Sequence, residues 1–423
     1  MKEIKLVGLD QSVFFTKLES GLEIYFIPYE NKSNYAMHYI TKFGSRNMEF
    51  KPIDEKKFIK VPAGIAHFLE HKMFEQEDGE DPFSFAAKTG TSSNATTSFN
   101  TTRYYFEGNM GFEENLNYLL DFVHTPYFTD ENVEKEKGII TEEIKQYDDE
   151  IDWFLDEEIR KAIFHKDPVR FDIAGTEDSI SEITKELLYQ TYNTYYQPSN
   201  MILMISGSFD KERAMNIITT NESLKNATTN KPIEEKKEKE PEEVQAKTKK
   251  LFFNVANKKV AYVVKIPLKG VKDPYRLNLY LGLFNSIKFG LSSTFREQMK
   301  QKKLITSFYT EREIYGEYLL LSYIASSDRP EEFVAEVKKE LTTLDIEESE
   351  IERLKKVWIS SEVVMVDNIS LTLDNILYDV ITYGNIIPNK TEIYRSLNVV
   401  ELKKMISKIN FSNASFITVC PKK

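Results

Sequence analysis

The chain has 423 residues, 41% of them hydrophobic, and this length predicts two domains of ordinary size. Its 56 Lys and Arg against 67 Asp and Glu give a net charge of −11, which argues against nucleic acid or an anionic membrane as a partner. The only cysteine, Cys420, excludes an intrachain disulfide and favours a reducing compartment. No apolar run approaches the ~20 residues of a membrane span, and the first residues lack a secretory signal, so we expect a cytoplasmic protein.

Strands dominate the beginning of the chain. Between Ser12 and Phe43 three runs rich in β-branched and aromatic residues are separated by turn residues such as Gly21. A charged loop follows, and the pattern then changes to a helix over Val61–Phe74. The chain therefore opens with a sheet that leads directly into a helix.

That helix contains the sequence G-I-A-H-F-L-E-H-K-M-F, from Gly64 to Phe74. His67 and His71 are four residues apart, so a helix places both imidazoles on one face, where they can bind one metal ion. Glu70 points towards the same edge and can reach a water molecule activated there. The order H-x-x-E-H is the inverzincin signature of zinc peptidases. Such pairs also occur by chance, but two of the five histidines of the chain fall in this array.

A catalytic zinc ion usually has three protein ligands, so two histidines leave one ligand to be found. A second predicted helix, over Asp130–Asp148, contains V-E-K-E-K-G-I-I-T-E-E-I. Glu136 and Glu143 lie seven residues apart on one face of it, whereas Glu142 points about 100° away. A glutamate-rich helix is by itself more often a solvated surface. Together with the histidine array it indicates that this helix supplies the third ligand, from the face that carries Glu136 and Glu143.

Between the two helices, Pro82–Thr89 predicts a short helix, and the sequence A-T-T-S-F-N-T-T-R-Y-Y-F-E after Asn94 predicts one strand. This strand starts with small and hydroxyl residues, which is unusual for a buried central strand, and these first residues carry no charge that would guard an open edge. We therefore predict an edge strand that is available for pairing.

The chain then repeats its own pattern. Residues 219–250 are densely charged and predict a solvated linker between a domain at 1–218 and a domain at 251–423. The sequence of Leu402–Ile409, N-F-S-N and A-S-F-I-T-V-C repeats the earlier order of a helix, Q-P-S-N and M-I-L-M-I-S, so that Asn413 corresponds to Asn200. Since the second half has no H-x-x-E-H, only the first domain should hold a metal.

These motifs resemble those of the pitrilysin, insulinase and mitochondrial processing peptidase family, in its bacterial two-domain form. The likeness covers most of the first half and is carried by H-F-L-E-H, by G-T-S-S-N-A-T-T-S-F-N-T-T-R-Y-Y-F, by the glutamate helix, by A-G-T-E-D-S-I and by Y-Q-P-S-N. The resemblance implies an α+β fold of two homologous domains, each an antiparallel sheet covered by helices. It also implies that the predicted edge strand pairs with a peptide substrate at Asn94, Ala95 and Thr96.

We interpret the chain as a zinc endopeptidase that cuts peptides or small unfolded polypeptides inside a closed chamber. His67, His71 and Glu143 would bind Zn²⁺, and Glu70 would act as the general base. Glu136 would support catalysis by orienting a ligand histidine. A non-catalytic subunit that binds peptides or scaffolds a partner is the main alternative, and a zinc hydrolase acting on another substrate class is a third.

One departure from the family concerns an Arg and a Tyr, seven residues apart, that its members carry in the domain facing the zinc. The nearest stretch here is Phe295–Tyr309, where Thr306 falls at the tyrosine position and no arginine stands at the expected place. Arg296 and Tyr309 are thirteen residues apart. We therefore expect a heterodimer with a related subunit that supplies the pair, although a homodimer is also consistent with the sequence.

Overall fold

The computed structural model describes residues 1–53, 55–147, 149–227 and 231–422. Contacts divide the chain into two compact units, and neither is continuous in sequence. Unit 1 comprises Met1–Gln146, Phe171–Lys237 and Val363–Asn389, and unit 2 comprises Tyr147–Arg170, Glu238–Glu362 and Lys390–Lys423. The division at 1–218, 219–250 and 251–423 stays a prediction, and residues 228–230 of that linker lie outside the described residues.

Unit 1 is built on a seven-stranded sheet with the order β1-β2-β3-β9-β4-β8-β7. All neighbouring strands are antiparallel except β3 and β9, which run parallel. A parallel pair needs a long crossover connection, and here most of the first half of the chain lies between the two strands. The strands are β1 Lys2–Lys5, β2 Ser12–Lys17, β3 Glu23–Pro28, β4 Tyr35–Thr41, β7 Ser92–Thr97, β8 Thr102–Gly108 and β9 Met201–Gly207.

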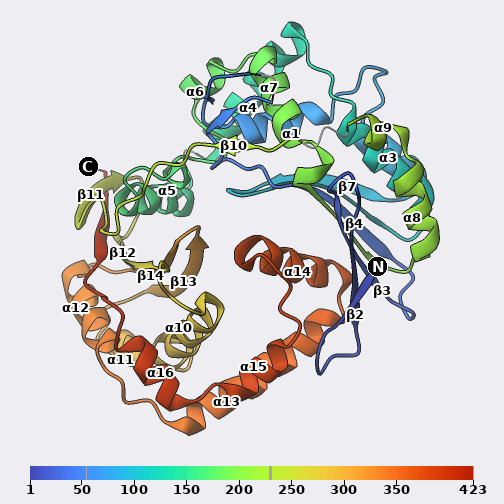
Figure 1. Cartoon of the computed structure of the whole chain (residues 1–423). Coiled ribbons are helices and arrows are strands. Elements are labelled where there is room, and N and C mark those ends of the chain that lie inside the picture. The colour runs from blue at the N-terminus through green and yellow to red at the C-terminus, as the bar shows by residue number, and fades with distance from the viewer. Residues whose placement is uncertain (54, 148, 228–230, 423) are drawn as a thin grey trace. The chain divides into compact units, whose positions relative to one another are not determined.

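Helices cover both faces of this sheet, and they come from different parts of the sequence. One face carries the helices of the first half, which share a buried apolar cluster with β3, β4 and β9: α1 Ile65–Met73, α2 Pro82–Thr89, α3 Phe112–His124, α4 Asp130–Tyr147, α7 Lys185–Tyr195 and α8 Lys211–Thr220. The opposite face is covered by α14, Ile369–Tyr383, from the second half of the chain (Figure 1). Leu373 and Ile376 of α14 pack there against Ile40 and Met204.

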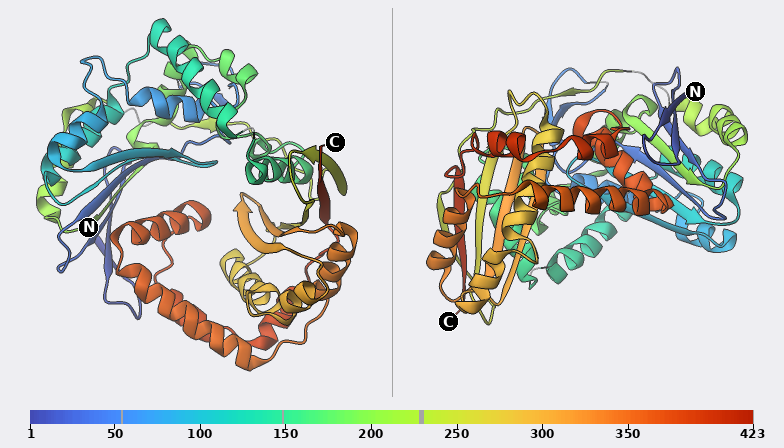
Figure 2. Two further views of the ribbon diagram at one scale, coloured as in Figure 1. Left: turned by 180° about the vertical axis from the view of Figure 1, so that it is seen from behind. Right: turned by 90° about the horizontal axis from the view of Figure 1, so that it is seen from below.

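Unit 2 contains a five-stranded sheet, seen with the helices beside it in Figure 2. Its strand order β11-β15-β12-β14-β13 repeats the order β3-β9-β4-β8-β7 of unit 1 with the same strand directions. Its strands are β11 Thr248–Phe253, β12 Lys259–Pro267, β13 Ser307–Tyr315, β14 Tyr318–Ser326 and β15 Ala414–Pro421. One face is covered by α10 Pro274–Phe289, α11 Thr294–Gln301, α12 Pro330–Leu341, α13 Glu348–Val366, α15 Lys390–Ser396 and α16 Val399–Ile406.

The predicted internal repeat is visible in single hydrogen bonds. The Lys42 amide donates to the Asn200 carbonyl at 3.1 Å, and the Lys265 amide donates to the Asn413 carbonyl at 2.9 Å. The α+β fold class with two homologous halves is thus confirmed. Each sheet also contains one parallel pair that the prediction of antiparallel sheets did not include.

The two halves of the sequence also exchange a helix. Just as α14 from the second half covers the sheet of unit 1, α5 (Ile151–Ile163) from the first half belongs to unit 2. Its Leu155 and Ile159 are buried, and Phe154 stacks on Phe253 of β11 at 4.6 Å. The carbonyl of Ile163 accepts a hydrogen bond from Lys265 of β12 at 3.2 Å. Each half of the sequence therefore supplies one helix to the unit built mainly by the other.

Two expectations about local structure were wrong. The segment after Asn94 is not one strand, because Ser98 and Thr101 close a tight turn between β7 and β8, with the Ser98 amide donating to the Thr101 carbonyl at 2.8 Å. The 219–250 segment is also not solvated throughout. Glu240 is buried, forms an ion pair with Lys265 at 2.7 Å, and accepts the backbone amides of residues 165–167. Charge density alone cannot distinguish a solvated glutamate from one with a buried partner.

The remaining elements are short. A three-stranded sheet of order β10-β5-β6 joins Glu234–Glu235, Glu49–Lys51 and Ile59–Lys60, and the other helices are α6 Glu177–Ser181, α9 Glu222–Asn226 and the 3-10 turns Pro168–Arg170 and Pro198–Asn200. Within the described ranges, no helix combines the length and the apolar character that crossing a bilayer requires.

The α14 face of unit 1 encloses a histidine that should make stability depend on pH. His38 of β4 is 2% exposed, and its Nε2 lies 3.8 Å from the Glu107 carboxylate. Glu107 accepts a hydrogen bond from Ser370 of α14 at 2.8 Å, and Arg103 of β8 pairs with Asp374 of α14. Burial lowers the pKa of His38 from its ordinary 6.5, and the Glu107 carboxylate offsets only part of this effect.

We expect the free energy of unfolding to fall as the pH drops from about 7.5 to about 5.5, since only the unfolded chain then protonates this histidine. The contribution of His38 is at most about 1.4 kcal/mol at the lower pH. His38→Gln removes it, so the difference in stability between the two pH values should shrink. Denaturant unfolding of both proteins, stripped of metal, measures this difference. Equal pH dependence in the two proteins would contradict the prediction.

Candidate active site

Helix α1 starts at a tight contact between two glycines. Gly64 precedes the helix with φ 91°, and Gly175 faces it with φ 81°. A Cβ on Gly64 would clash with the carbonyl of Ala174, and a Cβ on Gly175 would clash with the carbonyl of Ala63. The A-G-T-E-D-S-I stretch thus fixes the beginning of α1. The helix starts at Ile65, later than the predicted Val61, because Gly64 takes the left-handed conformation.

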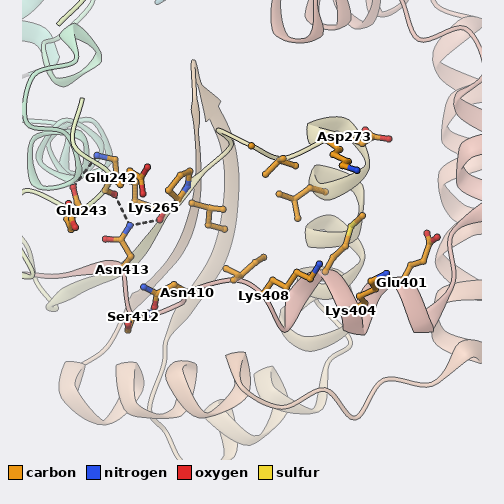
Figure 3. Close-up of a pocket in the computed structure, with 18 of the residues that line it drawn as sticks. Glu242, Glu243, Lys265, Asp273, Glu401, Lys404, Lys408, Asn410, Ser412 and Asn413 are labelled. Carbon is orange, nitrogen blue, oxygen red and sulfur yellow. Dashed lines mark hydrogen bonds between the residues drawn. The ribbon is translucent and has the colours of Figure 1, made fainter. Parts of the chain in front are cut away.

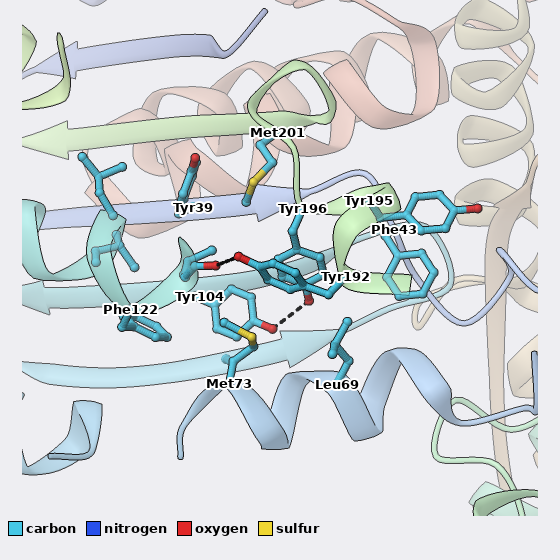
Figure 4. Packing of buried hydrophobic residues seen from close by; sticks show 14 of the residues in the cluster. Tyr39, Phe43, Leu69, Met73, Tyr104, Phe122, Tyr192, Tyr195, Tyr196 and Met201 are labelled. Carbon is cyan, nitrogen blue, oxygen red and sulfur yellow. Dashed lines mark hydrogen bonds between the residues drawn. The ribbon is translucent and has the colours of Figure 1, made fainter. Parts of the chain in front are cut away.

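The two sides of α1 have different surroundings. Ile65, Leu69 and Met73 follow the helical period and are buried in the apolar cluster, where Leu69 and Met73 lie beside tyrosines of β8 and α7 (Figure 4). His67 and His71 lie on another side, with ring centroids 4.5 Å apart. The apolar side therefore fixes the helix rotation that turns the histidines towards α4.

The two imidazoles meet a carboxylate of α4. His67 Nε2 lies 3.8 Å from Glu143 Oε1, and His71 Nε2 lies 3.5 Å from Glu143 Oε2. One donor atom from each of the three residues lies within 4.8 Å of the other two. Glu142 points away and pairs with Lys145 at 2.9 Å on the exposed side of the helix. The structure thus brings together His67, His71 and Glu143, and it leaves Glu142 out.

Glu136, two turns before Glu143 on α4, contacts His71 on the side of the ring away from Glu143. Its Oε1 lies 3.0 Å from His71 Nδ1, so His71 is held through the nitrogen that faces away from Glu143. Its Oε2 lies 4.0 Å from Nζ of Lys72, whose side chain is fully buried and also pairs with Glu75. A fully buried lysine is rare unless it is paired. Lys72 therefore supplies a counter-charge beneath the cluster, which sequence reasoning missed.

Glu70 faces the edge of the sheet. Its Oε2 accepts a hydrogen bond from Thr97 Oγ1 of β7 at 2.6 Å, which links the candidate base to the end of the edge strand. Sequence reasoning also missed Thr97, although it directly follows the three predicted substrate-binding residues. Of these, Asn94 and Thr96 are exposed and Ala95 is buried. Among the described strands, β7 pairs with β8 alone.

The electrostatics of the site indicate an excess of negative charge. Burial and the nearby Glu143 carboxylate raise the pKa of Glu70. Burial alone would lower the pKa of His71, but the carboxylates of Glu136, Glu70 and Glu143 together outweigh it and raise the pKa of that imidazole. Burial, with His71 as a second cause, lowers the pKa of His67 to about 3, so this ring is in the neutral form that binds metals. A divalent cation would offset the repulsion among the carboxylates.

The donor set fits zinc. Ligands bound at about 2.0–2.2 Å in a tetrahedral arrangement lie roughly 3.3–3.6 Å apart, close to the distances of 3.5 and 3.8 Å between the imidazole nitrogens and Glu143. Two imidazoles and one carboxylate leave a fourth position open. His71 has the carboxylate support at its second nitrogen that metal-binding histidines commonly have.

Comparison with known proteins agrees with these motifs. Residues 60–177 match the model of the insulinase family (peptidase family M16), and residues 182–357 match that of the peptidase M16 inactive domain. The zinc protease YmfH of Bacillus subtilis (strain 168), described as uncharacterised, is 40% identical over 312 residues, 73% of each chain. The chain belongs to the insulinase family of peptidases, M16.

Solved structures place this M16 chain among proteins of the same fold. A protein from Alicyclobacillus acidocaldarius, described as M16-like, superposes with a TM-score of 0.89 at 26% identity, over 99% of this chain and 100% of the other. Pitrilysin superposes with a TM-score of 0.76 at 15% identity, which is a likeness in fold alone. The match covers 100% of this chain but 46% of the pitrilysin chain.

The absence of the Arg/Tyr pair stays a prediction, and the structure shows the contacts of the residues that the sequence offers near its expected place. Arg296 of α11 donates to the carbonyl of Phe308 at 2.7 Å and lies over the Phe308 ring, so it holds α11 on β13. Tyr309 is half-buried on β13, and Thr306 donates its amide to the Ser326 carbonyl at 3.0 Å. These residues have structural contacts of their own.

The neighbouring glutamates of α4 offer a matched test of metal binding. We expect Glu143→Ala to weaken zinc binding by more than the roughly 10–100-fold that losing a supporting residue costs, because it removes one of three donors. Glu142→Ala, one residue away on the exposed side, should bind zinc like the wild type. Zinc content after dialysis and competition with a chromophoric chelator measure both. If Glu142→Ala lost the metal instead, the ligand set would have to be reassigned.

Proposed function

We propose that this M16 chain is a zinc-dependent endopeptidase that hydrolyses peptides or small unfolded polypeptides. The observation that carries the proposal is the convergence of His67, His71 and Glu143 beside Glu70, at the end of the edge strand β7. The naming of the relatives as zinc proteases supports the same class of reaction. The pairing edge of β7 favours an extended peptide over a compact small substrate.

In this mechanism His67, His71 and Glu143 would hold the metal, and Glu136 keeps His71 oriented through its Nδ1. When bound, zinc would polarise the scissile carbonyl and acidify water. Glu70 accepts the proton of the attacking water on its carboxylate and then donates it to the leaving amine nitrogen. Thr97 holds Glu70 in place through its hydroxyl. Asn94, Ala95 and Thr96 of β7 align the substrate backbone by strand pairing.

The alternative is a non-catalytic subunit that binds peptides or scaffolds a partner. The match of residues 182–357 to the inactive-domain model favours it for the second half of the chain. The intact donor set in unit 1 favours the peptidase for the chain as a whole. The two functions differ in whether peptide cleavage depends on Glu70.

Glu70→Gln keeps the shape of the side chain and removes its basicity. We expect the variant to bind zinc while peptide cleavage falls by about 10²–10⁴-fold, the usual contribution of a general base. Cleavage of a fluorogenic peptide and zinc content are measured on the same sample, with Glu142→Gln as the control for loss of an acidic side chain. Cleavage at the wild-type rate by Glu70→Gln would rule out the mechanism, and absence of cleavage in every form would favour the alternative.

We further propose that the active form is a heterodimer with a related subunit. The chain supplies two homologous halves and spans about half of pitrilysin, and its unit 2 lacks the Arg/Tyr pair at the expected positions. A subunit with that pair but without H-x-x-E-H would complete the site and close a chamber around the substrate. The competing arrangement is a homodimer in which another residue of this chain replaces the pair.

Mixing experiments separate these arrangements. We expect the purified chain to cleave flexible peptides weakly alone and strongly after addition of the related subunit from the same organism, with a mixed dimer seen by light scattering. The Glu70→Gln chain mixed with the same subunit should stay inactive, because the partner contributes no metal motif. Full activity of the chain alone would contradict the heterodimer and support the homodimer.

A further inference from the structure

Unit 2 contains a cavity that the proposed peptidase mechanism does not use. It has a volume of about 820 Å³, within the range of about 300–1,000 Å³ that small-molecule sites occupy. It lies between the end of β12, the beginning of α10, and α16 with the turn that follows it (Figure 3). All its walls belong to unit 2.

Comparison with the first half of the chain explains why this space is open. In unit 1 the connection from β4 to α1 runs over residues 42–64, and its Met48, Phe50 and Val61 are buried in the core. The Phe50 ring contacts Tyr195 of α7 at 4.9 Å. In unit 2 the equivalent connection, from β12 to α10, is only residues 268–273. This connection of unit 2 is therefore too short to fill the corresponding space.

The residues around the space have changed accordingly. Asn200 and Asn413 are equivalent, because their carbonyls accept corresponding backbone hydrogen bonds. Counting back five residues from each, without gaps, places Lys408 at the position of Tyr195. Tyr195 is buried between aromatic rings in unit 1, whereas Lys408 is exposed and lines the cavity. Lys404, one turn earlier, also lines it. A long cationic side chain, Lys408, thus stands where unit 1 has a buried tyrosine.

The lysines of the cavity and the acidic groups near them differ in whether they already have partners. Lys404 and Lys408, four residues apart, line one end, Lys272 lines the cavity from the loop before α10, and none of them forms an ion pair with any residue that the structure describes. The two acidic groups near them are already engaged: Asp273 accepts the Arg276 amide at 2.8 Å, and Glu401 pairs with Arg276 and accepts the Tyr280 hydroxyl at 2.6 Å. This end of the cavity therefore has cationic donors available for an anion.

The rest of the lining restricts the kind of anion. Apolar side chains lie beside these lysines, and acidic side chains line the wall near Lys265: Ile266, Pro267, Val271, Leu277, Met405 and Ile409 are apolar, and Glu242 and Glu243 are acidic. A polyanion would meet the acidic wall. A molecule with one anionic group and an apolar body matches both the lysines and the apolar surface.

We propose that this cavity is a binding site for a small carboxylate with an aliphatic or aromatic body. The carboxylate lies against Lys404 and Lys408, and the body covers Leu277 and Met405. The site belongs to unit 2 and does not depend on the metal centre of unit 1, so it stands or falls separately from the proposed peptidase activity.

Octanoate is the probe, and octylamine and acetate are its controls. Calorimetric titration of the full chain should show octanoate binding, no binding of octylamine because its charge is reversed, and much weaker binding of acetate because it lacks the body. The variant Lys404→Glu/Lys408→Glu should bind octanoate at least about tenfold more weakly. Lys300→Glu/Lys356→Glu changes the net charge equally at exposed lysines outside the cavity and should bind like the wild type.

A second variant tests the cavity without changing its charge. Met405→Trp fills the space and should also weaken octanoate binding, which surface attraction to lysines alone would not predict. The proposal is overturned if octanoate does not bind at millimolar concentration, if octylamine binds equally, or if both lining variants bind like the wild type. Peptide cleavage by the same samples reports separately on the metal centre.

Discussion

The carboxylate of Glu136 is the contact on which the geometry of the site depends. It joins α4 to α1 through His71 on one side and approaches the buried Lys72 on the other. Because Glu143 is two turns further along the same helix, the contact at Glu136 also fixes where the third donor stands. The apolar side of α1 sets the rotation of the histidines, and Glu136 sets the register of α4 against them. Removing either constraint would let the three donors drift apart by more than a metal tolerates.

The same strand order occurs in both units, and one strand position near the candidate site differs between them. Strand register places Arg312 of β13 at the position of Thr97 of β7. Thr97 donates to Glu70, whereas the Arg312 guanidinium lies against Gly282 of α10, where any Cβ would clash with it. The same strand position thus carries a hydroxyl that contacts a carboxylate in unit 1 and an exposed guanidinium in unit 2.

Much of this arrangement could be predicted from the sequence, because it rests on spacing within single elements. The four-residue spacing of His67 and His71 and the seven-residue spacing of Glu136 and Glu143 define helix faces, and the fold places these faces opposite each other. The contacts of Thr97 and Lys72 could not be predicted, because each depends on how two elements meet in space. The buried role of Glu240 was hidden for the same reason: its partner Lys265 lies on another element, and a charged stretch gives no indication of it.

Because α5 and α14 are exchanged between the units, neither half of the sequence contains all the helices that cover its own sheet. A fragment that ends at residue 218 would keep His67, His71 and Glu143 of the candidate metal site, yet it would expose Ile40, Met204 and the buried His38 where α14 normally packs. A fragment that begins at residue 251 would likewise leave β12 and β15 without α5. Cutting the chain between the halves would leave two pieces that must stay associated to keep both sheets covered. The duplicated halves are therefore partners in folding and cannot be treated as exchangeable modules, although each has the complete strand order of its own sheet.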